Sequence, residues 1–206
     1  SRQNLDVDTL DLVQLHCPPT DVYGSDEVFD ALDTLVDEKA IAAYGVSVEE
    51  TSQALTAIAR PNVASVQIIL NAFRLKPLDE VLPAAREAGV GILARVPLAS
   101  GLLSGRYDES TTFAEDDHRR QRWSPQALAI RVRQVAQIRF LVKEQVRSLT
   151  AAALRFALDS SVVTTAIVGA RRPAQVRDLG SLVGDPPYMD HADAMRLQQV
   201  LAAAGV

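Results

Sequence analysis

The feature of this sequence that most constrains its fold is a repeated alternation of short apolar runs with segments of helical period. Five runs of strand character are centred near positions 13, 43, 67, 93 and 165, and the first four follow one another at about 25 to 30 residues. Strands that alternate with helices form a parallel sheet with crossover helices, and this interval is the unit length of a (β/α)₈ barrel. The sequence therefore predicts an α/β protein of the TIM-barrel class.

The composition excludes several classes of protein. The 206 residues are 48% hydrophobic, and the formal charge is 21 minus 26, or −5, without a basic block, so nucleic acid is not an expected partner. No run of about 18 apolar residues is present, and we expect no membrane span. The single Cys17 excludes an internal disulfide and fits a reducing compartment. We expect one cytoplasmic domain over residues 1–206, with its oligomeric state left open.

The fourth strand runs into a loop of small residues between Val90 and Tyr107. Gly101 and Gly105 carry no Cβ and allow a ligand to approach the backbone. Ser100 offers a hydroxyl, and Arg106 offers a fixed positive charge suited to phosphate. This combination is typical of a nucleotide-binding loop in a parallel α/β protein. An ordinary strand-to-helix connection is the alternative, and spacing alone slightly favours it.

Polar residues stand at the carboxyl ends of the predicted strands. His16 can donate a hydrogen bond to a carbonyl oxygen and polarise it, although a histidine paired with a backbone group is the alternative. Ser47 and Gln67 can bind a carboxamide, or they can simply satisfy loop amides. A turn at Gly169–Arg171 before a helix suits an anion. No metal site is expected, because no Cys/His cluster has ligand spacing.

Five segments in register carry a resemblance to a known family. They are Asp11–Pro18, Ala43–Ser47, Ser65–Asn71, Val96–Tyr107 and Ile167–Gln175. In order and spacing the chain resembles the aldo-keto reductases, in particular the longer-chain branch that includes potassium-channel β-subunits. One such segment would be weak support, whereas five in register are specific.

The resemblance implies reduction of an aldehyde or ketone by NADPH, without metal or flavin, with His16 orienting the substrate carbonyl. The cofactor-binding positions that it implies are Ser47, Gln67, Arg95, Val96, Pro97, Leu98, Ser100, Arg106, Gly169, Arg171, Gln175 and Asp178. A guanidinium beside a helix N-terminus suits a phosphate dianion, and this favours NADP over NAD.

Three residues depart from the family pattern. Arg95 replaces an aromatic ring that stacks on the nicotinamide, although a guanidinium plane can also stack on a ring. Val48 stands in place of a polar residue, and Leu179 replaces an asparagine that contacts adenine. We expect each change to lower cofactor affinity without abolishing it.

The resemblance also leads to an expectation about the start of the chain. His16 matches the end of the family's fourth strand, so we expect strands 4–8 of the barrel to be present and strands 1–3 to be missing. On this expectation the domain is incomplete at its N-terminus, the general acid lies in the missing part, and the chain as given is inactive. A non-catalytic nucleotide-binding sensor or scaffold module is the alternative function.

Overall fold

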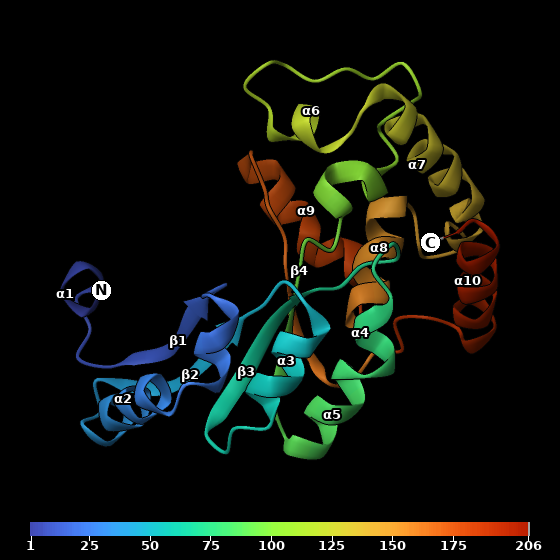
Figure 1. The fold of residues 1–206 in the computed structure, drawn as a ribbon. Coiled ribbons are helices and arrows are strands. Elements are labelled where there is room, and N and C mark those ends of the chain that lie inside the picture. The colour runs from blue at the N-terminus through green and yellow to red at the C-terminus, as the bar shows by residue number, and fades with distance from the viewer. Residues whose placement is uncertain (206) are drawn as a thin grey trace. The chain divides into compact units, whose positions relative to one another are not determined.

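A computed structural model of the chain describes residues 1–205 (Figure 1). Its five strands belong to one sheet in the order β1-β2-β3-β4-β5. They are β1 Leu10–His16, β2 Ile41–Ser47, β3 Val63–Ile69, β4 Gly91–Arg95 and β5 Val163–Ile167. The pairs β1–β2, β2–β3 and β3–β4 are parallel, which confirms the prediction of a parallel sheet.

Helices connect the strands. The α-helices are α1 Arg2–Leu5, α2 Asp26–Asp37, α3 Thr51–Ile58, α4 Lys76–Asp79, α5 Val81–Ala88, α6 His118–Arg122, α7 Pro125–Gln137, α8 Leu149–Leu158, α9 Pro173–Val183 and α10 His191–Ala203. Three short 3₁₀ segments are η1 Thr20–Gly24, η2 Ala99–Ser104 and η3 Arg139–Leu141. No helix within residues 1–205 is both long enough and apolar enough to cross a membrane.

Local signals in the sequence set the helix ends. Ser25 caps α2, where its hydroxyl accepts a hydrogen bond from the amide of Val28. Ser124 caps α7 in the same way, with Pro125 at the first helical position. Gly89 ends α5 with a φ of 69°, a left-handed conformation that suits a residue without a Cβ.

Two helical stretches are interrupted. Residues 76–88 form α4 and α5 rather than one helix, because Glu80 has a non-helical backbone (φ −121°, ψ −49°). Helix α7 ends at Gln137, because Ile138 has left the helical conformation, and η3 follows.

The described residues divide into two compact units. Unit 1 comprises Ser1–Ile69, Leu75–Arg95 and Ser160–Thr165. Unit 2 comprises Leu70–Arg74, Val96–Asp159 and Ala166–Val206, of which residue 206 is not described. Whether the chain is one domain over 1–206 stays a prediction.

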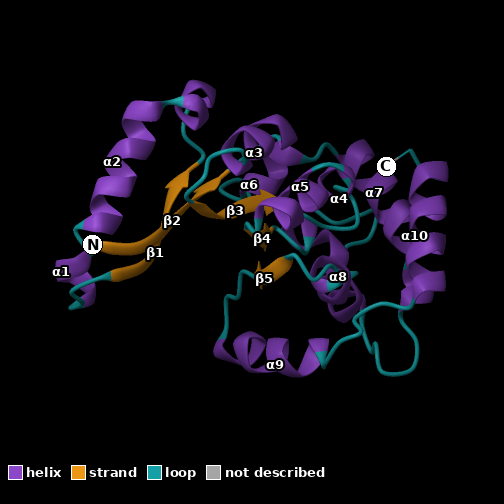
Figure 2. Ribbon diagram, turned by 90° about the horizontal axis from the view of Figure 1, so that it is seen from below, coloured by secondary structure: helices purple, strands orange, loops and turns teal. Residues whose placement is uncertain are grey.

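In unit 1 the helices cover one face of β2, β3 and β4. Helix α2 contacts β2, α3 contacts β3 and α5 contacts β4, and α3 and α5 lie on the same side of β3 (Figure 2). Alternate residues of the strands are buried beneath these helices, namely Tyr44, Val46, Val66, Ile68, Ile92 and Ala94. The residues between them face the other side of the sheet and carry the polar groups.

Unit 2 has its own apolar core. Its fully or nearly fully buried leucines come from η2, α7, α8 and α10 and are Leu102, Leu103, Leu128, Leu154, Leu197 and Leu201. Because α8 contacts both η2 and α9, it is the element that holds these two segments of unit 2 in place.

The expected barrel numbering needs correction. We expected strands 4–8 of a (β/α)₈ barrel, with strands 1–3 missing before them. The structure shows a five-stranded sheet whose strands are neighbours in chain order. The expectation rested on matching His16 to the end of the family's fourth strand, and such a motif match does not determine how many strands the fold contains.

Candidate functional site

The carboxyl ends of the parallel strands in unit 1 bring three predicted site residues into one row. His16 of β1 is in register with Ser47 of β2, and Ser47 is in register with Gln67 of β3. In a parallel sheet, residues in register on neighbouring strands point to the same face. The imidazole, hydroxyl and carboxamide therefore share one face and one level, with His16 exposed, Gln67 half-buried and Ser47 1% exposed.

A chain of hydrogen bonds fixes Gln67. Its Nε2 donates to Gln14 Oε1 at 2.7 Å, and Gln14 Nε2 donates to Ser65 Oγ at 3.2 Å. Gly45 makes this chain possible, because a Cβ at that position would lie 2.3 Å from Ser65 Oγ and 2.4 Å from the carbonyl oxygen of Ser65. One N–H of Gln67 is used in this chain of bonds, and Gln67 can offer its amide oxygen as the acceptor for a ligand N–H.

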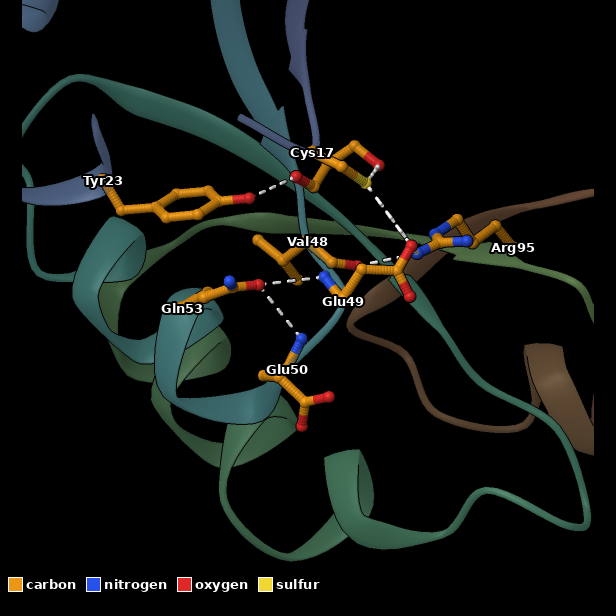
Figure 3. A network of polar contacts seen from close by, with 8 residues as sticks. Cys17, Tyr23, Val48, Glu49, Glu50, Gln53 and Arg95 are labelled. Atoms are coloured by element: carbon orange, nitrogen blue, oxygen red, sulfur yellow. Dashed lines mark hydrogen bonds and ion pairs between the residues drawn. The ribbon is translucent and has the colours of Figure 1, made fainter. Parts of the chain in front are cut away.

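Arg95, at the end of β4, is held across the neighbouring strand ends (Figure 3). Its Nη2 donates to the carbonyl oxygen of Val48 at 2.9 Å and to Glu49 Oε1 at 2.6 Å. The Arg95 side chain is 17% exposed, and that of Glu49 is 55% exposed. The guanidinium is therefore mostly withdrawn from water, which strengthens its electrostatic interactions.

Cys17 connects this ion pair to Ser47. Its Sγ lies 3.3 Å from Ser47 Oγ, 3.6 Å from Glu49 Oε1 and 3.9 Å from Arg95 Nη2. The residue has a left-handed backbone with a φ of 46°, which is uncommon outside glycine. Strained backbone of this kind clusters at functional sites.

The peptide group of Ser47 is fixed from two sides. Its carbonyl oxygen accepts hydrogen bonds from Tyr23 Oη at 2.9 Å and from the amide of Cys17 at 3.1 Å. Burial raises the pKa of Tyr23 above its ordinary value, with the charges of Cys17 and Glu49 as further causes. Tyr23 therefore stays protonated and keeps donating at neutral pH.

The predicted loop after β4 belongs to unit 2 and has an unusual backbone. Val96, Ala99 and Ser100 have φ values of 54°, 47° and 55°, and Gly101 has 91°. A β-branched residue such as Val96 in this region is a genuine outlier. Asn71 stabilises it: Nδ2 donates to the Val96 carbonyl oxygen at 3.0 Å, while Oδ1 accepts from the amide of Phe73 at 2.9 Å.

A second group of side chains supports the far end of this loop. Tyr107 Oη donates to the carbonyl oxygen of Ser100 at 3.2 Å and accepts from Arg119 Nη1 at 2.6 Å. Arg119 is bound to Asp117, with Nε 2.8 Å from Oδ1. The hydrogen bonds from Arg119 hold the pKa of Asp117 below its usual range, because they favour the ionised carboxylate.

The segment expected to bind the adenosine end precedes and enters α9, also in unit 2. Gly169 and Arg171 are exposed, and Asp178 is exposed on α9. Gln175 Oε1 accepts from the amides of Arg171 at 2.8 Å and Arg172 at 3.0 Å. Gln175 therefore caps the helix, and only its NH₂ group remains to donate to a ligand.

The structure thus places the predicted site residues in two groups. His16, Ser47, Gln67 and Arg95 meet at the strand ends of unit 1. Unit 2 contains the remaining positions, namely Val96, Pro97, Leu98, Ser100, Arg106, Gly169, Arg171, Gln175 and Asp178. That all of them bind one cofactor stays a prediction.

Sequence reasoning missed the side chains that support the site. No pattern pairs Glu49 with Arg95, 46 residues away, or Tyr107 with Arg119. Cys17 was noted only as a lone thiol. Asn71 stands just after the third apolar run, at a position where a polar side chain often ends a strand. The sequence does not indicate its hydrogen bond to Val96.

Side chains of unit 1 suit the nicotinamide end of a dinucleotide, and separate side chains of unit 2 suit phosphates. Arg95 Nε is buried and finds no acceptor within residues 1–205, so it is a group that a ligand can satisfy. The amide oxygen of Gln67 and the hydroxyl of Ser47 suit a carboxamide, and the exposed guanidinium groups of Arg106 and Arg171 suit phosphates. In the described part of the chain, no three histidine, cysteine or acidic side chains form a set that could hold a metal ion.

Comparison with known proteins identifies relatives of this chain. The aldo-keto reductase YhdN of Bacillus subtilis (strain 168) is 31% identical over 189 residues, which cover 89% of this chain and 56% of the relative. The D-threo-aldose 1-dehydrogenase of Pseudomonas sp. is 31% identical over 192 residues, which cover 85% of this chain and 52% of the relative. The chain therefore spans about half the length of these curated relatives.

A solved structure has the same fold. The glycerol dehydrogenase AKR11B4 from Gluconobacter oxydans superimposes with a TM-score of 0.84 at 29% identity, over 98% of this chain and 62% of that chain. The aldo-keto reductase AKR11C1 from Bacillus halodurans, in its holo form, gives a TM-score of 0.74 at 25% identity, over 97% of this chain and 63% of that chain. These likenesses support an aldo-keto reductase (β/α)₈-type fold.

The sequence profile described as "Aldo/keto reductase family" matches residues 1–183. This match contradicts the expectation of a barrel reduced to strands 4–8. The expectation that the chain as given is inactive stays a prediction. The profile covers most of the sequence and both groups of site residues, so the chain belongs to the aldo/keto reductase family.

Proposed function

We propose that this protein reduces an aldehyde or ketone to an alcohol with NADPH. The observation that carries the proposal is the row of His16, Ser47 and Gln67 at adjoining strand ends, with Arg95 fixed beside it. A hydrogen-bond donor next to a pair that can hold a carboxamide suits hydride transfer to a carbonyl, because it can stabilise the negative charge that develops on the oxygen. Its place in the longer-chain branch, with potassium-channel β-subunits, rests on the motif resemblance. A cytoplasmic location is supported by the free thiol of Cys17.

Each residue has a separate task in this proposal. When bound, NADPH supplies a hydride to the carbonyl carbon, the oxygen takes a proton from water, and NADP⁺ and the alcohol are released. His16 donates a hydrogen bond to the carbonyl oxygen, where negative charge develops. Ser47 and Gln67 orient the carboxamide: Gln67 accepts through its amide oxygen, while one of its N–H groups is held by Gln14.

The adenosine side of the proposal rests on charge. Arg106 and Arg171 are exposed, and no ion pair within residues 1–205 engages either guanidinium. An unpaired guanidinium interacts strongly with a phosphate dianion, which supports NADP rather than NAD. The small-molecule substrate class follows from the relatives, since one is named for an aldose and another for glycerol. We therefore propose small hydroxylated aldehydes and ketones.

Titration with NADPH, followed by consumption of NADPH with a panel of such carbonyl compounds, tests the proposal. We expect His16→Gln to lower kcat by roughly 10²- to 10³-fold while the cofactor Kd changes little, since His16 acts on the transition state. His191→Gln, at an exposed histidine that begins α10, is the control and should retain activity. Absence of NADPH binding, or full activity of His16→Gln, would overturn the proposal.

A second candidate is a nucleotide-binding sensor or scaffold without turnover. The observation that favours it is the engagement of Arg95 by Val48 and Glu49, because the guanidinium is less free to stack on a nicotinamide ring. Tight NADPH binding without consumption of any carbonyl compound would support this candidate over the enzyme.

A further inference from the structure

Glu49 and Arg95 form an ion pair at the carboxyl ends of the strands in unit 1. Arg95 ends β4 and reaches the loop after β2, where its Nη2 contacts Glu49 Oε1 at 2.6 Å. Figure 3 shows the carboxylate of Glu49 directed toward Arg95, whereas that of Glu50 points away from it. Glu49 thereby counters a guanidinium that is mostly removed from water.

This charge pair lies beside Ser47. Cys17 Sγ is 3.9 Å from Arg95 Nη2 and 3.3 Å from Ser47 Oγ, so one atom bridges the guanidinium and the hydroxyl. Under the proposed function, Ser47 binds the carboxamide of the nicotinamide ring. The ring then lies within reach of the field of Arg95 and Glu49.

The two redox states of the ring differ in charge. The oxidised nicotinamide is a cation, and the reduced ring is neutral. A nearby uncompensated cation therefore weakens binding of the oxidised form, and an uncompensated anion strengthens it. The charges of a closely paired carboxylate and guanidinium nearly cancel. Such a pair therefore changes the relative affinity for the oxidised and reduced nicotinamide only a little.

We propose that Glu49, acting through its ion pair with Arg95, sets the relative affinity of the protein for NADP⁺ and NADPH. Glu49 is a positioning residue that holds the guanidinium and balances its charge. This inference rests on the proposed function, because it requires the nicotinamide to bind beside Ser47.

Kd values of NADP⁺ and NADPH for four proteins test the inference. In Glu49→Gln the uncompensated Arg95 disfavours the cationic ring, so the ratio of the NADP⁺ Kd to the NADPH Kd should rise about 3- to 10-fold. In Arg95→Gln the cation is lost while the carboxylate of Glu49 stays, so the ratio should move in the opposite direction by a similar factor. The double variant Glu49→Gln/Arg95→Gln is neutral again, and its ratio should return to within about twofold of the wild-type ratio.

Glu50→Gln is the matched control, since it removes the same charge one residue away. Its ratio should stay within about twofold of wild type, because its carboxylate is directed away from Arg95. A merely structural role for Glu49 would weaken both cofactors together and leave the ratio unchanged. Should Arg95→Gln fail to fold, the ratio measured for Glu49→Gln alone tests the inference. That variant should fold, because the side chain of Glu49 is 55% exposed.

The outcomes separate the two proposals. Wild-type protein that binds neither cofactor would overturn the proposed function and this inference with it. Wild-type protein that binds both, with no change of ratio in Glu49→Gln, would overturn the inference alone. Opposite shifts in the single variants and their cancellation in the double variant are the result that we expect.

Discussion

The side-chain amide of Asn71 donates a 3.0 Å hydrogen bond to the carbonyl oxygen of Val96, and this bond holds a valine in the left-handed region. Asn71 is 4% exposed, and its Oδ1 also accepts from the amide of Phe73. The loop that follows β4 thus depends on a residue that follows β3. Backbone strain of this kind persists only where surrounding structure enforces it.

Replacement of Asn71 by alanine should therefore destabilise the protein. It leaves the Val96 carbonyl and the Phe73 amide without their partner, and a buried unpaired group costs about 1–3 kcal/mol. Denaturant unfolding measures this loss. Asn62→Ala, which removes an exposed hydrogen bond to Asp33, should change the free energy of unfolding by less than about 0.5 kcal/mol. Equal effects of the two variants would contradict the role of Asn71.

Gly45 should tolerate no side chain. In Gly45→Ala the new Cβ would lie 2.4 Å from the Ser65 carbonyl oxygen, a backbone atom that cannot turn away, so β2 and β3 must separate. We expect a loss of about 2 kcal/mol or more in the free energy of unfolding. Gly180→Ala is the contrasting variant, since its Cβ meets nothing within 4 Å, and it should stabilise α9 by about 0.5–1 kcal/mol. A neutral Gly45→Ala would show that the register of β2 and β3 is wrong.

Gly101 and Tyr107 should be energetically coupled. A Cβ at Gly101 would lie 2.5 Å from Tyr107 Oη but 3.2 Å from the ring carbon that bears the hydroxyl, so Tyr107→Phe removes the worst contact. Gly101→Ala should therefore destabilise the Tyr107→Phe protein less than the wild type, by about 1 kcal/mol in a double-mutant cycle. The strain of a φ of 91° remains in both backgrounds and cancels. Additive effects would mean that the hydroxyl does not limit the space at Gly101.

The ion pair of Asp117 and Arg119 should make stability depend on acid pH. Hydrogen bonds from Arg119 lower the pKa of Asp117 in the folded protein below its unfolded value. By linkage, a lowered pKa in the folded state adds to the free energy of unfolding. This added stability is fully present above the unfolded pKa of about 4 and is lost as the pH falls toward the pKa of the folded state.

Asp117→Asn should thus be less stable than the wild type at pH 7, and the gap between the two should narrow on acidification below about pH 4. Denaturation midpoints of both proteins across this range measure the gap. Asp116→Asn, at the exposed neighbouring position, serves as control. A gap that stays constant with pH would contradict the assignment of the low pKa to Asp117.

The sequence by itself determined the parallel α/β class, the order of strands and helices, and the helix caps. These depend on local signals: apolar runs such as Ile41–Val46, the capping serines Ser25 and Ser124, and Gly89 at a helix end. It also placed His16, Ser47 and Gln67 at strand ends, and the parallel register alone then aligned them.

Only the tertiary structure decided which side chains support these residues. The contacts of Glu49 with Arg95, Cys17 with Ser47, and Asn71 with Val96 join segments that lie 46, 30 and 25 residues apart. A sequence pattern reports the period of a residue within its own element, whereas such contacts depend on how whole elements pack. The expectation of strands 4–8 alone likewise rested on a local motif at His16, and the family match over residues 1–183 contradicts it.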